Sequence, residues 1–143
     1  MPPTNFFDQI KKFNKMYNMP ENGKFDLVGR LENFHLIVDE ELEEINDILD
    51  KANGPSMGEL SNEYTESELK VDVADLLGDI IVYCASEAER WGIPIDKVLN
   101  IIMESNFSKL DENGNPIYDE RGKLLKGPNY WKPEAKIKKL LEQ

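Results

Sequence analysis

Apolar side chains recur at helical spacing along most of this 143-residue chain. The spacing predicts a first helix over residues 4–17 and a long second helix over 26–52. Residues typical of turns follow both helices, within 18–23 and within 53–55, and should end them. The next segment, 56–64, is polar and predicts a loop.

Capping signals mark the start of a third helix. Thr65 and Glu68 fit a capping box, in which each side chain satisfies a free backbone amide. The helix should run to about Trp91, where Gly92-Ile93-Pro94 forms a stop and a restart. A fourth helix is then expected as far as about Phe107.

The last part of the chain predicts short elements. Two extended runs, 116–118 and 123–125, flank a turn, and they fit a small hairpin about as well as a plain loop. A short last helix is expected over 133–141. The predicted fold class is therefore all-α: a four-helix-type bundle with a C-terminal loop or small hairpin and a short last helix. The length fits one domain, residues 1–143.

The third helix combines apolar and acidic side chains in an unusual way. Its apolar residues lie almost all round it, which predicts that the helix is buried. Yet Asp72, Asp75 and Asp79 stand at positions i, i+3 and i+7, with Glu68 one turn earlier. An unpaired buried carboxylate costs several kcal/mol, so a compensating cation is expected. Basic side chains are few on this helix, which makes a divalent metal the better candidate.

A second acidic group lies in the second helix, in the run Asp39-Glu40-Glu41-Leu42-Glu43-Glu44. Alone it predicts only a solvated acidic face. However, Glu41 and Glu44 share one face, and carboxylates spaced in this way on two facing helices form an all-oxygen site. Such ligands favour Mg²⁺ or Mn²⁺. The lone histidine, His35, and the lone cysteine, Cys84, are too few for a zinc site.

The charge of the chain limits the classes of ligand that it can bind. With 17 basic and 28 acidic side chains the net charge is −11, which argues against a nucleic-acid polymer as ligand. Basic residues gather near the end of the chain: residues 121–143 hold seven, against two acidic ones. An acidic body with a basic tail suits a small anionic ligand held between metal and lysines.

The sequence also indicates the cellular compartment in which the protein is expected. No stretch approaches the roughly 20 apolar residues that span a membrane, and no leader segment precedes the first helix, so no membrane is expected. The apolar surroundings of Cys84 predict a buried structural thiol, and a lone cysteine fits a reducing compartment. The expected location is the cytoplasm.

Four segments, 40–44, 72–77, 105–110 and 123–131, each resemble a sequence motif, and the four motifs occur in this order in one protein family. The first resembles a Glu-Glu-x-x-Glu motif, and the second a Glu-x-x-Asp motif with Asp72 in place of the usual glutamate. The third is similar to an Asn-x-Ser-Lys segment and the fourth to a Lys-Gly-Pro-Asn-Tyr ending. Together they resemble the MazG-like all-α nucleoside triphosphate pyrophosphohydrolases, a superfamily that includes the dimeric dUTPases and phosphoribosyl-ATP pyrophosphohydrolase.

The resemblance implies hydrolysis of a nucleoside triphosphate between its α and β phosphates, giving a monophosphate and pyrophosphate. It implies a Mg²⁺ or Mn²⁺ cofactor with the ligands Glu41, Glu44, Asp72 and Asp75. Because Asp72 is one methylene shorter than the family's glutamate, Asp79 is a further candidate ligand. Glu40, rotated away from the ligand pair, is the candidate general base. The candidate substrate-binding residues are Asn106, Lys109, Lys126 and Tyr130.

Several alternatives stay open. The enzyme could hydrolyse phosphoribosyl-ATP instead, or the bundle could be a non-catalytic metal-binding interaction module. Tyr130 and Trp131 fit stacking on the base and anchoring of the tail about equally well. A homodimer or homotetramer is expected, because the third helix is apolar nearly all round and three other helices would leave part of it uncovered. The resemblance points the same way.

Overall fold

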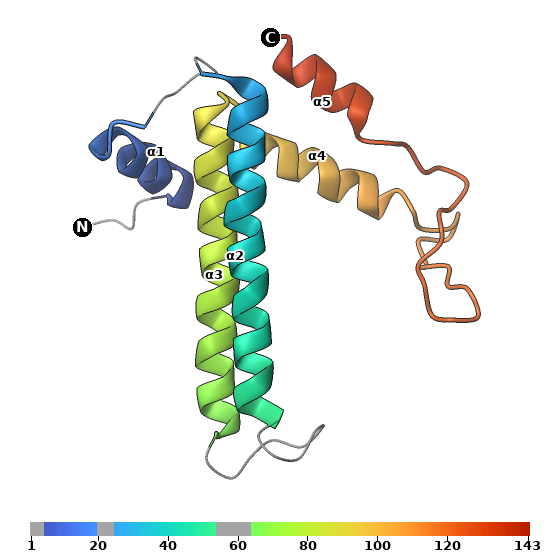
Figure 1. The fold of residues 1–143 in the computed structure, drawn as a ribbon. Coiled ribbons are helices and arrows are strands. Elements are labelled where there is room, and N and C mark those ends of the chain that lie inside the picture. Colours follow the sequence, from blue (N-terminus) through green and yellow to red (C-terminus); the bar gives the residue numbers. More distant parts are fainter. Residues whose placement is uncertain (1–4, 20–24, 54–63) are drawn as a thin grey trace. The chain divides into compact units, whose positions relative to one another are not determined.

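The computed structural model describes residues 5–19, 25–53 and 64–143. Five helices follow one another in these parts of the chain (Figure 1): α1 (Phe6–Met16), α2 (Leu27–Asn53), α3 (Glu66–Arg90), α4 (Ile95–Phe107) and α5 (Glu134–Leu141). The predicted all-α class is confirmed. None of the described helices combines the length and apolar content that crossing a bilayer requires.

The chain divides into two compact units, Met1–Gly92 and Ile93–Gln143. The first contains α1, α2 and α3, and the second contains α4 and α5. Within the described residues, neither unit by itself forms the predicted four-helix-type bundle.

Helix ends follow the local signals in the sequence. The Asn5 side chain accepts a hydrogen bond from the amide of Phe7 (2.8 Å) and caps α1. Thr65 Oγ1 accepts one from the amide of Glu68 (3.1 Å), which confirms the threonine half of the predicted capping box at α3. Each helix begins within two residues of its predicted start.

The chain leaves α1 through a residue with left-handed backbone. Asn18 has φ 53°, a conformation that asparagine tolerates better than most residues, and the predicted helix break begins there. The rest of that break, from residue 20, lies outside the described residues. So does the predicted loop 56–64, except for its last residue.

The first unit is a helical hairpin with one helix added. α2 and α3 run antiparallel, and both α2 and α1 pack on α3 (Figure 1). Asn14 of α1 is fully buried: its amide donates to the carbonyl of Ser86 (3.1 Å) and its Oδ1 accepts from Ser86 Oγ (2.7 Å). A buried polar pair of this kind fixes the position of α1 along α3, because separating it would leave unsatisfied groups.

Two ion pairs join α2 and α3 in the same register. Arg30 of α2 binds Glu87 of α3 through Nε and a terminal nitrogen, at 2.7–3.0 Å. Near the other end, Lys51 Nζ lies 3.7 Å from Asp72 Oδ2. The two pairs are contacts of a single antiparallel register, so the residues between them must face each other in order.

Much of α3 stays uncovered in the single chain. Leu77 is 54% exposed and Ile81 57%, and Val73 and Cys84 are also exposed. These four residues, called here the α3 stripe, recur at helical spacing along one face. The prediction that α3 is buried is wrong for the single chain, and so is the prediction that Cys84 is a buried thiol. Two packed helices cover only part of the circumference of a third.

The second unit joins two helices by tight turns. Asp111 Oδ1 accepts from the amides of Asn113 and Asn115, and Asp119 Oδ1 accepts from those of Arg121 and Lys123. A glycine in left-handed backbone lies three residues after each aspartate. Between the predicted extended runs there is one antiparallel bridge, Tyr118 with Leu124, so this segment is a minimal hairpin.

Candidate active site

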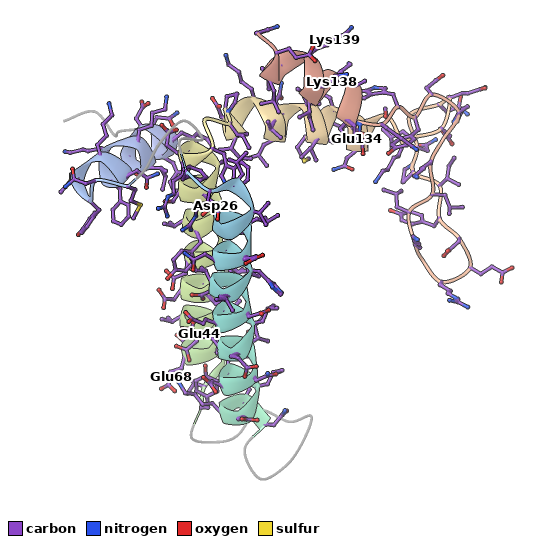
Figure 2. All side chains as sticks on the ribbon, turned by 45° about the horizontal axis from the view of Figure 1, so that its top comes forward. Asp26, Glu44, Glu68, Glu134, Lys138 and Lys139 are labelled. Atoms are coloured by element: carbon purple, nitrogen blue, oxygen red, sulfur yellow. The ribbon has the colours of Figure 1, made fainter. Side chains whose placement is uncertain are left out.

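Three carboxylates meet where α2 faces α3. Glu41 and Glu44 of α2 and Asp79 of α3 each offer one oxygen, and these oxygens lie within 4.8 Å of one another. We call this group the carboxylate cluster. Along the hairpin, Glu44 lies between Asp26, near one end, and Glu68, near the other (Figure 2). Two facing helices thus bring together acidic residues that are 35 or more positions apart in sequence.

Glu41 is the unusual member of the cluster. It is only 7% exposed, and its Oε2 is buried without a hydrogen-bond partner among the described residues. Burial, and then the negative charges of Glu44 and Asp79, raise the pKa of Glu41. A buried, unpaired carboxylate oxygen beside two acidic neighbours is costly, and a divalent cation would remove that cost. The donor set, all carboxylate oxygen, fits Mg²⁺ or Mn²⁺.

Tyr83 is a neighbour of the cluster that the sequence analysis missed. Burial raises the pKa of its phenol, and the charges of Glu41, Asp79 and Glu40 raise it further. The signal was present in the sequence, since Tyr83 follows Asp79 by four residues and so shares its face of α3. Glu40 is exposed and close enough to act on both Glu41 and Tyr83.

The structure places Asp72 in a different environment. Its Oδ2 accepts a hydrogen bond from the Tyr64 hydroxyl and pairs with Lys51. That hydrogen bond, with burial, raises the pKa of Tyr64 to about 12. Asp75 is exposed. Of the four predicted metal ligands, the described structure therefore brings Glu41 and Glu44 together, and it adds Asp79 to them.

The predicted substrate-binding residues all belong to the second unit. Asn106 and Lys126 are exposed, and Lys109 and Tyr130 are half-buried. Lys126 Nζ lies 5.0 Å from the ring centroid of Tyr130, so these two form one cationic and aromatic pair.

Gly127 brings the lysine segments together. Its amide donates to the carbonyl of Lys109 (2.7 Å), and an added Cβ would lie 2.6 Å from that oxygen and overlap the carbonyl of Leu110. Only glycine allows this approach. Lys109 and Lys126 are thus held next to each other through the backbone.

Trp131 is anchored in the same unit. Its carbonyl accepts from Ser105 Oγ (2.8 Å) and its amide donates to Ser108 Oγ (3.2 Å), while Lys136 Nζ lies 3.8 Å from its ring centroid. These contacts favour the anchoring alternative for Trp131.

A pocket of about 320 Å³ opens beside the carboxylate cluster, within the first unit. It shares Asp79 with the cluster and also contains Tyr83. Side chains of all three helices line it: Phe13, Met19, Arg30, Phe34, Ile37, Asp79, Val82, Tyr83, Ser86, Glu87 and Arg90. Its aromatic rings and arginines, next to an acidic cluster, suit a ligand with a flat polar group and an anionic end.

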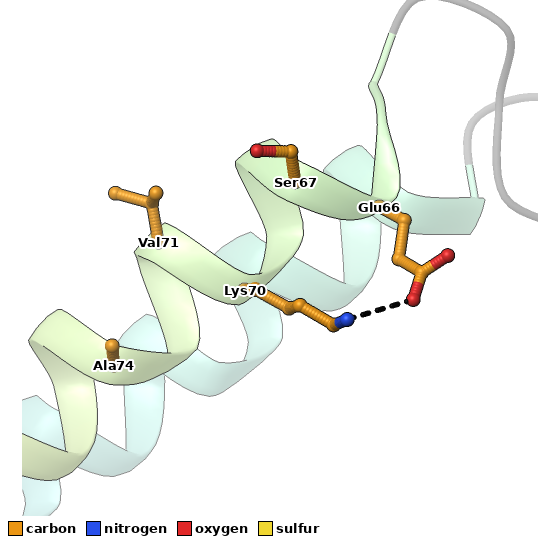
Figure 3. A pocket seen from close by; sticks show the side chains of 5 residues that line it. All are labelled: Glu66, Ser67, Lys70, Val71 and Ala74. Carbon is orange, nitrogen blue, oxygen red and sulfur yellow. Dashed lines mark ion pairs between the residues drawn. The ribbon is translucent and has the colours of Figure 1, made fainter.

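Another pocket lies on the first turns of α3 (Figure 3). Glu66, Ser67, Lys70, Val71 and Ala74 line it, and Lys70 Nζ pairs with a Glu66 carboxylate oxygen at 3.0 Å. It contains none of the predicted site residues. Its two charges neutralise each other, so it offers little to an anionic ligand.

Comparison with known proteins supports the fold. No family model and no curated protein matches the sequence. A solved structure from Exiguobacterium sp. 255-15, described as a "putative NTP pyrophosphohydrolase", matches with a TM-score of 0.53 and 18% sequence identity. The match covers 98% of this chain and 96% of that one. At this identity the similarity shows that the two proteins share a fold.

Proposed function

We propose that this protein is a metal-dependent nucleoside triphosphate pyrophosphohydrolase of the MazG-like family. The observation that carries the proposal is the buried, unpartnered Oε2 of Glu41 within a cluster of three carboxylates. The motif series in the sequence supports it, as does the fold shared with the Exiguobacterium protein and that protein's description. The reaction would cut the bond between the α and β phosphates.

In this proposal Glu41, Glu44 and Asp79 hold Mg²⁺ or Mn²⁺. The cation supplies charge neutralisation for the phosphates and lowers the pKa of water. Glu40, exposed beside the cluster, accepts the proton of the attacking water. Tyr83 lies close to the same carboxylates and can donate a hydrogen bond there.

The residues that the sequence predicts to bind the substrate remain proposed ligands of the triphosphate. Lys109 and Lys126, held next to each other through Gly127, would bind phosphate oxygens as point charges. Asn106 would donate a hydrogen bond, and the Tyr130 ring offers a face for stacking. A triphosphate needs such cations because its phosphate groups carry several negative charges.

A substrate screen tests the proposal. The common ribo- and deoxyribonucleoside triphosphates are incubated with Mg²⁺ or Mn²⁺, and released pyrophosphate and monophosphate are quantified. We expect turnover that excess chelator abolishes and added metal restores. Undiminished hydrolysis in chelator would refute the metal role, and no turnover of any triphosphate would refute the activity.

Two alternatives differ in their outcomes. Phosphoribosyl-ATP hydrolysis would show as turnover of that compound with little turnover of free triphosphates. A non-catalytic metal-binding module would bind Mn²⁺ and gain thermal stability from it while hydrolysing neither.

We also propose that the chain forms a homodimer or homotetramer through the α3 stripe. A stripe of exposed apolar side chains along a long helix is typical of a surface that a second copy covers. Sedimentation at micromolar concentration should show an oligomer, and Leu77→Glu should convert it to monomer. Leu141→Glu, which puts the same charge on a comparably exposed leucine of α5, should leave the oligomer intact. A monomeric wild-type protein would contradict this prediction.

A further inference from the structure

The pocket beside the carboxylate cluster has an ordered lining on α3. Asp79, Tyr83, Ser86 and Arg90 line it at positions i, i+4, i+7 and i+11, which is one face of the helix. Asp79 belongs to the cluster, so one end of this face is the proposed metal site. The other end is the guanidinium of Arg90.

The Arg90 end of the pocket has an excess of positive charge, with two arginines, Arg30 and Arg90, against one carboxylate, Glu87. Glu87 is the acidic residue there, and its two oxygens already accept hydrogen bonds from Arg30 and from Trp91 Nε1 (2.8 Å). Burial alone would raise the pKa of Glu87, but these hydrogen bonds outweigh it and the pKa is lowered, so this carboxylate is ionised and saturated.

One donor of Arg90 has no hydrogen-bond partner among the described residues. Its Nε is buried and no described group accepts a hydrogen bond from it. Burial, and then the nearby Arg30 guanidinium, lower the pKa of Arg90, yet arginine keeps its charge in proteins. A buried donor without an acceptor is costly, and a ligand with acceptor atoms would satisfy it.

Size and distance favour a base at this end of the pocket. Eleven residues of helix span about 16 Å, so the lining on α3 extends by about that length from Asp79 to Arg90. A volume of about 320 Å³ is near the lower limit for ligand pockets and suits part of a nucleotide. Phe34 and Tyr83 provide ring faces on which a base can stack.

We propose that this pocket takes the base of the substrate and that Arg90 makes it prefer guanine to adenine; this inference rests on the proposed function. Guanine presents two adjacent acceptors, O6 and N7, which match the fork of a guanidinium. Adenine presents N7 beside an amino donor, and that donor would face the guanidinium. Glu87 cannot accept from the adenine amino group, because Arg30 and Trp91 already occupy its oxygens.

Steady-state kinetics with dGTP and dATP test the preference, since the two substrates differ in the base alone. The wild-type protein should favour dGTP in kcat/KM by on the order of 10- to 100-fold. Arg90→Met should remove most of that advantage, because it lowers kcat/KM for dGTP much more than kcat/KM for dATP. Arg90→Lys keeps a charge but loses the planar fork, so it should behave like Arg90→Met.

Two outcomes would overturn the inference. Equal losses for dGTP and dATP in the Arg90 variants would place Arg90 on the phosphates instead. Calorimetric binding of guanosine and adenosine, which carry no phosphate, needs no turnover and separates this inference from the proposed activity. Tighter binding of guanosine that Arg90→Met removes supports the pocket assignment even without hydrolysis, and equal binding of the two nucleosides overturns it.

Discussion

Replacing Asp79 by asparagine should reduce metal binding and hydrolysis together. Asp79 contributes the oxygen from α3 to the carboxylate cluster, and hard cations bind a neutral amide much less well than a carboxylate. We expect hydrolysis to fall by more than about 100-fold. Loss of a residue that only orients a metal ligand typically costs up to about 100-fold, and loss of a direct ligand should cost more. Calorimetric Mn²⁺ titration and the shift of Tm with Mn²⁺ measure the loss of binding independently of turnover.

Asp72→Asn is the matched control for this prediction. It makes the same chemical change about two turns earlier on α3, where the carboxylate pairs with Lys51 and accepts a hydrogen bond from Tyr64. We expect Mn²⁺ affinity to persist and the free energy of unfolding to fall by about 1 kcal/mol or less, since the ion pair is partly exposed. If Asp72→Asn loses the metal and Asp79→Asn keeps it, the ligands implied by the family resemblance are the right ones.

Two adjacent glutamates should separate metal binding from turnover. Glu41 is buried in the carboxylate cluster, so Glu41→Gln should lose metal and activity together. Glu40 is exposed, and the helix rotates it by about 100° from Glu41. Glu40→Gln should therefore retain Mn²⁺ affinity while turnover drops by roughly two to four powers of ten, the usual scale for a general base.

Calorimetry beside steady-state rates distinguishes the outcomes for these two variants. Equal loss of Mn²⁺ by both would make Glu40 a ligand, and the base would have to be sought elsewhere. Full turnover by Glu40→Gln would remove its role altogether.

Local sequence signals predicted the helices well because their causes are local. Thr65 caps α3 through an amide three residues away, and a left-handed Asn18 follows α1. Burial was predicted less well. The exposure of Leu77 and Cys84 depends on which surfaces the rest of the chain can cover, and hydrophobic periodicity does not contain that information.

In the candidate site, too, the features with local causes were predicted better than those that depend on packing between helices. The acidic motifs lie on the two helices that form the carboxylate cluster, and Glu41 and Glu44 lie together in it. The α3 partner depends on the register between α2 and α3, which contacts such as Arg30 with Glu87 and Lys51 with Asp72 fix. Sequence spacing within one helix does not reveal register between two, so Asp79 could be named from sequence only as a further candidate.

Each compact unit contains one of the two tryptophans, Trp91 in the first and Trp131 in the second. The indole of Trp91 donates to Glu87, whereas that of Trp131 lies under Lys136, so the two fluorophores have different surroundings. Trp131→Phe leaves an optical signal from the first unit alone, and Trp91→Phe leaves one from the second. Coincident denaturant midpoints would mean that the units unfold cooperatively as one domain, and separate midpoints would give each unit a stability of its own.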